Sequence, residues 1–151
     1  MTGFILSVLD QSSVASGRSP AAAVQETLAL ARHVEALGFN RYWCAEHHNS
    51  ASHAGSAPEV LLAAIGATTS RIRIGSAGIM LPHYSALKVA EQFRMLEAIA
   101  PGRVDLGVGR GERGDEHLRV VADQCGQRGA AAVGRKMLHL EIGGFVEEGH
   151  R

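Results

Sequence analysis

The chain has 151 residues, of which 46% are hydrophobic, and its 15 basic and 15 acidic side chains give a formal net charge of zero. This length fits one domain with a substantial core, and the balanced charge gives no electrostatic reason to expect nucleic acid or an acidic membrane surface as a partner. Cys44 and Cys125 lack metal-ligand spacing, and residues 4–9 are too short an apolar run for a membrane span or a signal peptide, so we expect reduced thiols and a cytoplasmic location.

The chain begins with a predicted strand and a predicted helix. Residues 4–9 form an apolar strand that ends at Asp10. Ser19 is the expected N-cap of the helix, because the proline that follows it suits the first helical position. The helix continues to residue 37 and ends at Gly38, a residue type favoured just after a helix. Its buried face is predicted from apolar residues at three- and four-residue steps: Val24, Leu28, Ala31, Val34 and Leu37.

A second strand, residues 41–45, ends abruptly in the titratable side chains of Glu46, His47 and His48. Strands that are covered on both faces are nearly continuous apolar runs, so polar residues massed at one end indicate that the strand opens onto a site. The alternative for His47 is a histidine that is simply held by hydrogen bonds at a strand end. Neighbouring strand residues point to opposite faces and no spaced third ligand follows, so we reject a metal site for this triplet.

Two more helices and two more strands follow in alternation. Ser56 and Ser85 are the predicted caps of the second and third helices, which are separated by a strand over residues 72–81. A last strand covers residues 104–109. The third helix is predicted to bury one apolar face: Val89, Phe93, Leu96 and Ile99. Such regular alternation with short connections predicts an α/β fold with a parallel sheet and right-handed crossovers.

Two architectures fit this alternation: a doubly wound open sheet, or half of an eight-stranded barrel. The doubly wound sheet favours a glycine-rich phosphate loop after the first strand. Residues 10–13 are Asp-Gln-Ser-Ser, and the glycine pair at Gly107 and Gly109 is weak evidence for such a loop elsewhere. A dinucleotide site of this type is therefore not expected.

From about residue 5 to Arg110 the chain resembles the luciferase-like FMN-dependent monooxygenases, a family that includes bacterial luciferase. The resemblance covers only the N-terminal half of that family's barrel and rests on blocks in a fixed order: SVLDQS at 7–12, LGFNRYWCAEHH at 37–48, IGSAGIMLP at 74–82, AEQFRMLE at 90–97 and LGVGR at 106–110. It implies a (β/α)8 TIM-barrel type of fold, here a partial barrel of about four β/α units over residues 1–110. It also implies that reduced FMN and O2 oxidise a small organic substrate at the carboxyl ends of the strands, with a separate flavin reductase as a possible source of the cofactor.

The resemblance assigns roles to three charged or titratable residues. His47 matches the family's active-site histidine, whose imidazole exchanges protons near neutral pH. Glu46 is expected to orient that imidazole or a neighbouring helix end, with a purely structural role as the alternative. Arg110 matches the family's phosphate-binding arginine, and its planar guanidinium suits the FMN phosphate. Its alternative is a solvated loop arginine.

The resemblance also singles out Ser76, Ala77 and Gly78. These residues are small enough for the flat flavin ring to lie against the backbone. Relatives often contain a non-proline cis peptide bond in this segment, and by position it joins Ala77 and Gly78. The alternative is that the small side chains only allow helices to pack.

The match stops after Arg110, and residues 111–151 are expected to form an irregular C-terminal tail that is divergent or truncated. Four parallel strands without their partners leave two open sheet edges, so we expect homo-oligomers through those edges. Two alternatives to the monooxygenase stay open. One is a non-catalytic truncated remnant or association module, and the other is a deazaflavin-dependent reductase of the same superfamily.

Overall fold

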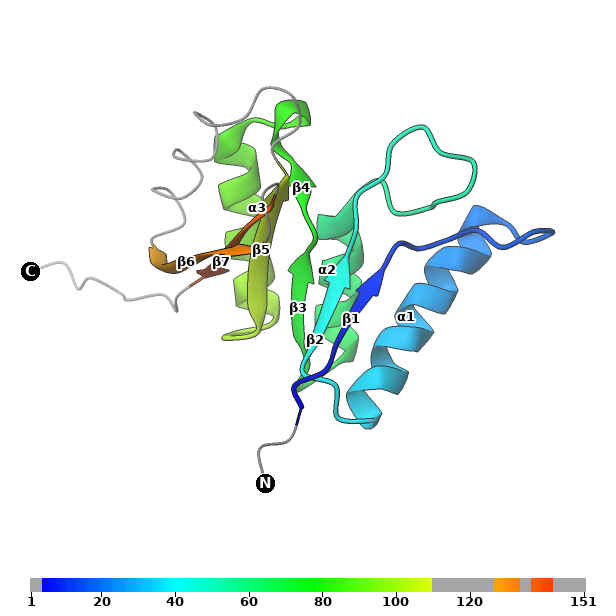
Figure 1. Cartoon of the computed structure of the whole chain (residues 1–151), viewed down its shortest axis with the longest axis horizontal. Coiled ribbons are helices and arrows are strands. Elements are labelled where there is room, and N and C mark those ends of the chain that lie inside the picture. Colours follow the sequence, from blue (N-terminus) through cyan, green and yellow to red (C-terminus); the bar gives the residue numbers. More distant parts are fainter. Residues whose placement is uncertain (1–3, 110–126, 134–136, 143–151) are drawn as a thin grey trace, which may run out of the picture.

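The computed structural model describes residues 4–109, 127–133 and 137–142. Strands and helices alternate along most of its length (Figure 1). The elements are β1 (Ser7–Asp10), α1 (Pro20–Ala36), β2 (Arg41–Cys44), α2 (Pro58–Thr68), β3 (Arg73–Ser76), β4 (Ile79–Met80), the 3-10 turn η1 (Leu81–His83), α3 (Ala86–Ile99), β5 (Val104–Gly109), β6 (Gln127–Val133) and β7 (Met137–Ile142).

The first strands of the sheet are parallel, as the sequence predicts. β1, β2, β3 and β5 lie side by side in that order, and the short β4 also pairs with β5. The expected strand over residues 72–81 is divided into β3 and β4, whereas the last predicted strand is confirmed as β5 with the same bounds.

The segment after β5 differs from the expected irregular tail. β7 pairs antiparallel with β5, and β6 pairs antiparallel with β7. The expectation that the β5 edge is open is therefore wrong, because a hairpin covers it. Strands pair through backbone N–H and C=O groups, and every residue except proline has both. Short apolar stretches between glycines can therefore still form paired strands.

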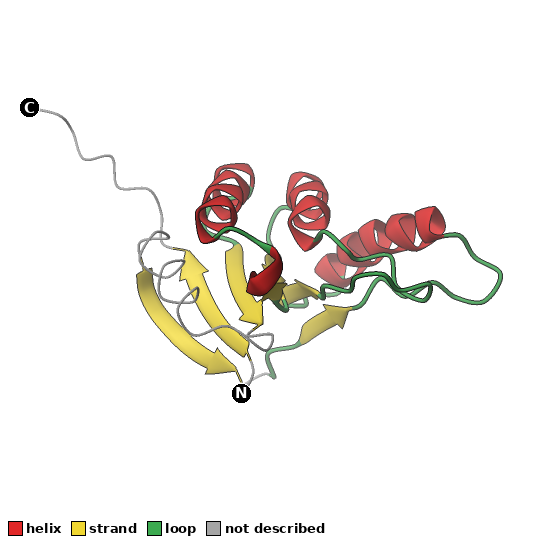
Figure 2. Ribbon diagram, turned by 90° about the horizontal axis from the view of Figure 1, so that it is seen from above, coloured by secondary structure: helices red, strands yellow, loops and turns green. Residues whose placement is uncertain are grey.

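The described α-helices, α1, α2 and α3, lie on the same face of the sheet (Figure 2). A doubly wound sheet carries helices on both faces, whereas a (β/α)8 barrel carries all its helices outside and turns the other face of the sheet inward. The arrangement therefore decides between the two architectures left open by the sequence, and the fold is a partial barrel.

The core lies between the sheet and these helices. Alternate strand residues face the helices, and Tyr42, Ile74 and Leu106 are fully buried there. Phe93 of α3 and Leu62 of α2 pack into the same cluster. Burial of large apolar side chains is the main force that holds the helices on this face.

Helix ends follow the sequence in part. The hydroxyl of Ser19 accepts a hydrogen bond from a backbone N–H of α1 and caps it as predicted. Ser85 occupies the cap position of α3 without a side-chain hydrogen bond, and the prediction for Ser56 is wrong because Ala57 precedes α2. Leu37 and Ile99 are exposed, so the predicted apolar stripes are each one residue too long.

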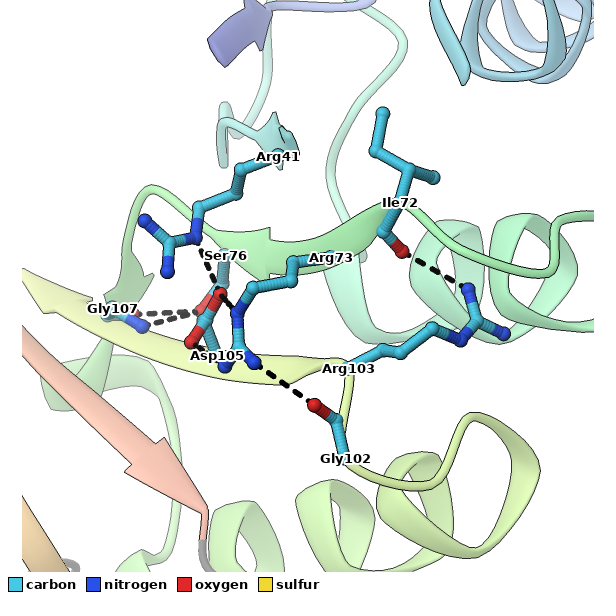
Figure 3. A network of polar contacts seen from close by, with 8 residues as sticks. All are labelled: Arg41, Ile72, Arg73, Ser76, Gly102, Arg103, Asp105 and Gly107. Atoms are coloured by element: carbon cyan, nitrogen blue, oxygen red, sulfur yellow. Dashed lines mark hydrogen bonds and ion pairs between the residues drawn. The ribbon is translucent and has the colours of Figure 1, made fainter. Parts of the chain in front are cut away.

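The inner face of the sheet carries polar and aromatic side chains. Asp105 of β5 is fully buried and accepts hydrogen bonds from Arg41 Nε at 2.6 Å and Arg73 Nε at 3.0 Å (Figure 3). The guanidinium of Arg41 lies 5.2 Å from the centre of the Trp43 ring. This ring in turn covers Gly75, the Cα partner of Trp43 on β3.

Gly75→Ala is expected to destabilise the fold by overpacking the inner face. A Cβ atom on Gly75 would lie 2.5 Å from the Trp43 ring and 2.9 Å from the Cβ of Asp105. Such an insertion lowers the free energy of unfolding by about 1–3 kcal/mol. Denaturation in urea measures this decrease. Gly109→Ala is the matched control, because its Cβ would meet nothing closer than 3.6 Å. Equal stability of the two variants would contradict the packing of Trp43 on Gly75.

Candidate functional site

The carboxyl ends of the parallel strands lie at one end of the sheet, together with the loops that follow β1 and β2 (Figure 1). In barrels of this type the same end carries the site, because loops from several strands converge there. Three clusters of side chains occupy it in this chain, around Asp10, Glu46 and His47.

The first cluster fixes the loop after β1. One oxygen of Asp10 accepts a hydrogen bond from the N–H of Ser12 at 2.7 Å, and the other accepts from Thr27 Oγ1 at 2.7 Å and from the Tyr42 hydroxyl at 2.5 Å. Burial, together with the hydrogen bond to Asp10, raises the pKa of Tyr42. The hydroxyl therefore stays protonated as a donor, and the cluster joins β1, α1 and β2 beneath the site.

The second cluster is built around Glu46, whose side chain is buried. Its carboxylate accepts hydrogen bonds from the backbone N–H of Met80 at 2.9 Å and from the Tyr84 hydroxyl at 3.2 Å, and it contacts Nε2 of His48. Burial and the charge of Glu46 raise the pKa of Tyr84. None of the hydrogen bonds described for Glu46 reaches His47, so the expectation that it orients the His47 imidazole is not met. Met80 is the residue before η1, so the Glu46 carboxylate binds the backbone at the start of that turn.

The third cluster contains His47, just beyond the end of β2. Its ring stacks on that of His53, with centroids 4.2 Å apart and planes at 27°. Within the described residues, His47 Nε2 is buried and has no hydrogen-bond partner. Burial and the nearby His53 and His48 lower the pKa of His47, and Glu46 opposes them. The imidazole is therefore neutral at neutral pH, with one ring nitrogen able to accept a proton.

The peptide bond between Ala77 and Gly78 is cis, as the resemblance implied. Ser76 is fully buried, and its hydroxyl donates to the carbonyl oxygen of Gly107 at 2.8 Å and accepts from the Gly107 N–H at 3.1 Å (Figure 3). The Ser76 side chain thus joins β3 to β5, whereas Ala77 and Gly78 remain partly exposed.

The sequence did not reveal why position 78 is occupied by glycine. A Cβ on Gly78 would lie 2.9 Å from backbone carbons of Gly107 and Val108. The small residue lets the bend at the end of β3 approach β5, so the expected helix packing is not the explanation. Close approach of two strands is a common reason for glycine in a sheet.

Arg110, the predicted phosphate ligand, lies outside the described residues. Of the other predicted site residues, Glu46 and His47 follow β2, and Ser76, Ala77 and Gly78 end the neighbouring β3. The N–H of Ala77 donates to the carbonyl oxygen of Cys44 at 2.7 Å, which places the two groups side by side. Among the described residues, no three His, Cys, Asp or Glu side chains gather in a way that would hold a metal ion.

Two contributors to this end of the sheet were missed by the sequence reasoning. Tyr84 binds Glu46 from a position 38 residues further along the chain, and His53 reaches His47 across a loop. Neither carries a spacing signal, because the contacts depend on how the loops fold. The histidine content of the loop after β2 was the only available hint.

Comparison with known proteins gives a consistent result. A family model described as luciferase-like monooxygenase matches residues 2–132. The N-acetyl-S-alkylcysteine monooxygenase of Bacillus subtilis (strain 168) is 54% identical over 109 residues, which cover 72% of this chain and 33% of that protein. The matched part of the chain thus covers about a third of this relative's length. No helix of the described residues has the length and apolar character needed to cross a membrane.

Solved structures share the fold. The crystal structure of apo-MsnO8 has a TM-score of 0.70 and 46% identity, over 79% of this chain and 37% of that one. The oxygenating constituent of 3,6-diketocamphane monooxygenase from Pseudomonas putida, in complex with FMN, has a TM-score of 0.67 over 95% of this chain and 44% of its own. At 21% identity, the second likeness concerns the fold alone.

Proposed function

The chain belongs to the luciferase-like monooxygenase family, and from this premise we propose that it binds reduced FMN at the carboxyl ends of its strands and takes part in the oxidation of a small organic molecule by O2. The observation that carries the proposal is His47. A neutral imidazole lies just beyond the end of β2, and its buried Nε2 has no hydrogen-bond partner within the described residues.

The described residues fit a flavin. The partly exposed backbone at Ala77 and Gly78 lies beside the end of β2, where His47 follows. A flat ring needs such a surface without bulky side chains, and the neighbouring Nε2 of His47 is a polar atom suited to a bound molecule. When bound, reduced FMN would supply electrons to O2, so that one oxygen atom is transferred to the substrate and the other is reduced to water. Arg110, which follows β5, is proposed to bind the phosphate with its guanidinium.

His47 and Glu46 have different roles in this proposal. His47 accepts or returns a proton at Nε2, and its lowered pKa keeps the imidazole unprotonated at neutral pH. Glu46 holds the backbone at Met80, so that the segment with Ala77 and Gly78 keeps its place.

We propose N-acetyl-S-alkylcysteines as the first substrate class to examine, because a relative named for them is 54% identical over 109 residues.

A separate flavin reductase is proposed to supply reduced FMN. A cytoplasmic location is also proposed, and the free, buried thiol of Cys44 supports it. Self-association through the β1 edge is proposed because, among the described strands, β1 pairs only with β2.

An anaerobic titration tests the cofactor proposal. Purified chain is titrated with photoreduced FMN, with oxidised FMN and with a deazaflavin cofactor, and binding is followed by absorbance and fluorescence. We expect saturable binding of reduced FMN that is tighter than binding of the other two. Tighter binding of the deazaflavin would support the reductase alternative. No saturable binding of any of the three would support the non-catalytic alternative.

Arg110→Ala is expected to weaken FMN binding with little effect on stability. Loss of a charge-assisted hydrogen bond to phosphate costs roughly 1.5–3 kcal/mol, which the same titration measures as a change in Kd. Arg18→Ala is the control, because Arg18 forms an exposed ion pair with Glu26. An unchanged Kd in Arg110→Ala would remove this arginine from the proposed phosphate site.

A further inference from the structure

The loop between β2 and α2 also carries His53, a histidine that the proposed chemistry does not use. We propose that His53 is a positioning residue for His47: its ring, anchored within the loop, stacks on the His47 imidazole and fixes the plane of that imidazole, in which Nε2 is left for the bound molecule. This inference rests on the proposed function, and it adds a residue to the site.

The stacking contact is close and specific. The two rings lie 4.2 Å apart between centroids, with planes inclined by only 27°. A ring that tilts out of this nearly face-to-face arrangement loses the contact, so the stack restricts the plane in which Nε2 of His47 lies. Restricting a reacting group in this way lowers the entropy that is lost when the group reacts.

The side chain of His53 is itself fixed. Its Nδ1 lies 2.9 Å from Ser50 Oγ and 3.0 Å from Ser52 Oγ, both within hydrogen-bond distance. The two hydroxyls also lie 3.1 Å from each other, so a small polar network surrounds one edge of the ring. The other parts of the His53 ring are then free to stack on His47.

The backbone on both sides of His53 is fixed as well. The N–H of Val14 donates to the carbonyl oxygen of Ser52 at 2.8 Å, and the N–H of Ala54 donates to that of Ser12 at 2.9 Å. The N–H of His47 donates to the carbonyl oxygen of Gly55 at 2.9 Å. The β2–α2 loop is therefore fastened to the loop after β1, which the Asp10 cluster holds in place (Figure 1).

The stack also affects the protonation of His47. Three titratable groups act on this imidazole: Glu46 and His48 from its own segment, and His53 from the loop. Burial, to which the stacked ring contributes, is the largest influence and lowers the pKa of His47, and the charge of His53 lowers it further. Removing His53 should therefore raise the pH at which His47 takes up a proton, in the absence of any cofactor.

Two variants test the proposal. His53→Ala removes the ring, and His53→Phe keeps a ring that stacks but cannot be charged or bind the serines. The pKa of His47 is measured from its imidazole NMR signals, the affinity for photoreduced FMN by titration, and turnover from the loss of an N-acetyl-S-alkylcysteine. His33→Ala is the control, since His33 is exposed on α1.

In His53→Ala we expect the pKa of His47 to rise, turnover to fall about tenfold and FMN affinity to stay within about twofold. In His53→Phe the pKa of His47 should rise less, and most of the turnover should return. An unchanged His47 titration in both variants would overturn the proposal. The NMR titration needs no cofactor, so a wild-type chain that fails to bind FMN would refute the proposed function without deciding the role of His53.

Discussion

Asp105→Ala is expected to lower the free energy of unfolding by about 3 kcal/mol or more. The Asp105 carboxylate is fully buried on the inner face of the sheet and pairs with both Arg41 and Arg73 (Figure 3). Alanine would remove the carboxylate that the two guanidinium groups share and would leave their like charges close together. The side chains of both arginines are partly exposed, which keeps the expected loss at the lower end for a buried ion pair.

Urea denaturation of the wild type and of Asp105→Ala measures this loss directly. Glu26→Ala is the matched control, because Glu26 also pairs with an arginine but on the exposed surface of α1. Exposed pairs contribute only about 0–1 kcal/mol. If both variants lost similar, small amounts, the network on the inner face would not be a main support of the sheet.

His47→Asn is expected to reduce turnover by about a hundredfold or more, the usual contribution of one positioned acid or base. Asparagine keeps much of the size and polarity of histidine but does not titrate. Affinity for reduced FMN should therefore stay within a few-fold of the wild type. Turnover is followed as the loss of an N-acetyl-S-alkylcysteine with a supply of reduced FMN and O2.

The corresponding control is His33→Asn on the exposed side of α1, which should leave both turnover and affinity unchanged. If His47→Asn retained wild-type turnover, His47 would be a structural residue and the proposed proton transfer would be wrong. If FMN affinity fell as strongly as turnover, His47 would act mainly in binding.

Much of the parallel half of the fold was predictable because its signals are local. Ser19 and Pro20 marked the start of α1, Gly38 its end, and the apolar run after residue 103 gave β5 with its bounds. The cis peptide bond at Ala77 and Gly78 was predicted from the family resemblance. No property of these two residues alone would have indicated it.

The remaining features depend on contacts between distant segments. The partners of Glu46 were not predictable, because Tyr84 and Met80 approach it only after β3 and β4 have turned beside β2. The stack of His53 on His47 requires the loop after β2 to fold back onto the loop after β1. The hairpin of β6 and β7 was missed since the glycines around its apolar stretches obscured the strand pattern.

The proposed binding site for reduced FMN lies where His47 and the bend at Gly78 come together. Anaerobic titration of isotope-labelled chain with photoreduced FMN, followed by NMR, tests it most directly. We expect the imidazole signals of His47 and the amide signal of Gly78 to shift saturably with one common Kd, while the signals of His33 on α1 stay unchanged. Saturable FMN binding that leaves His47 and Gly78 unchanged, or no binding at all, would contradict it.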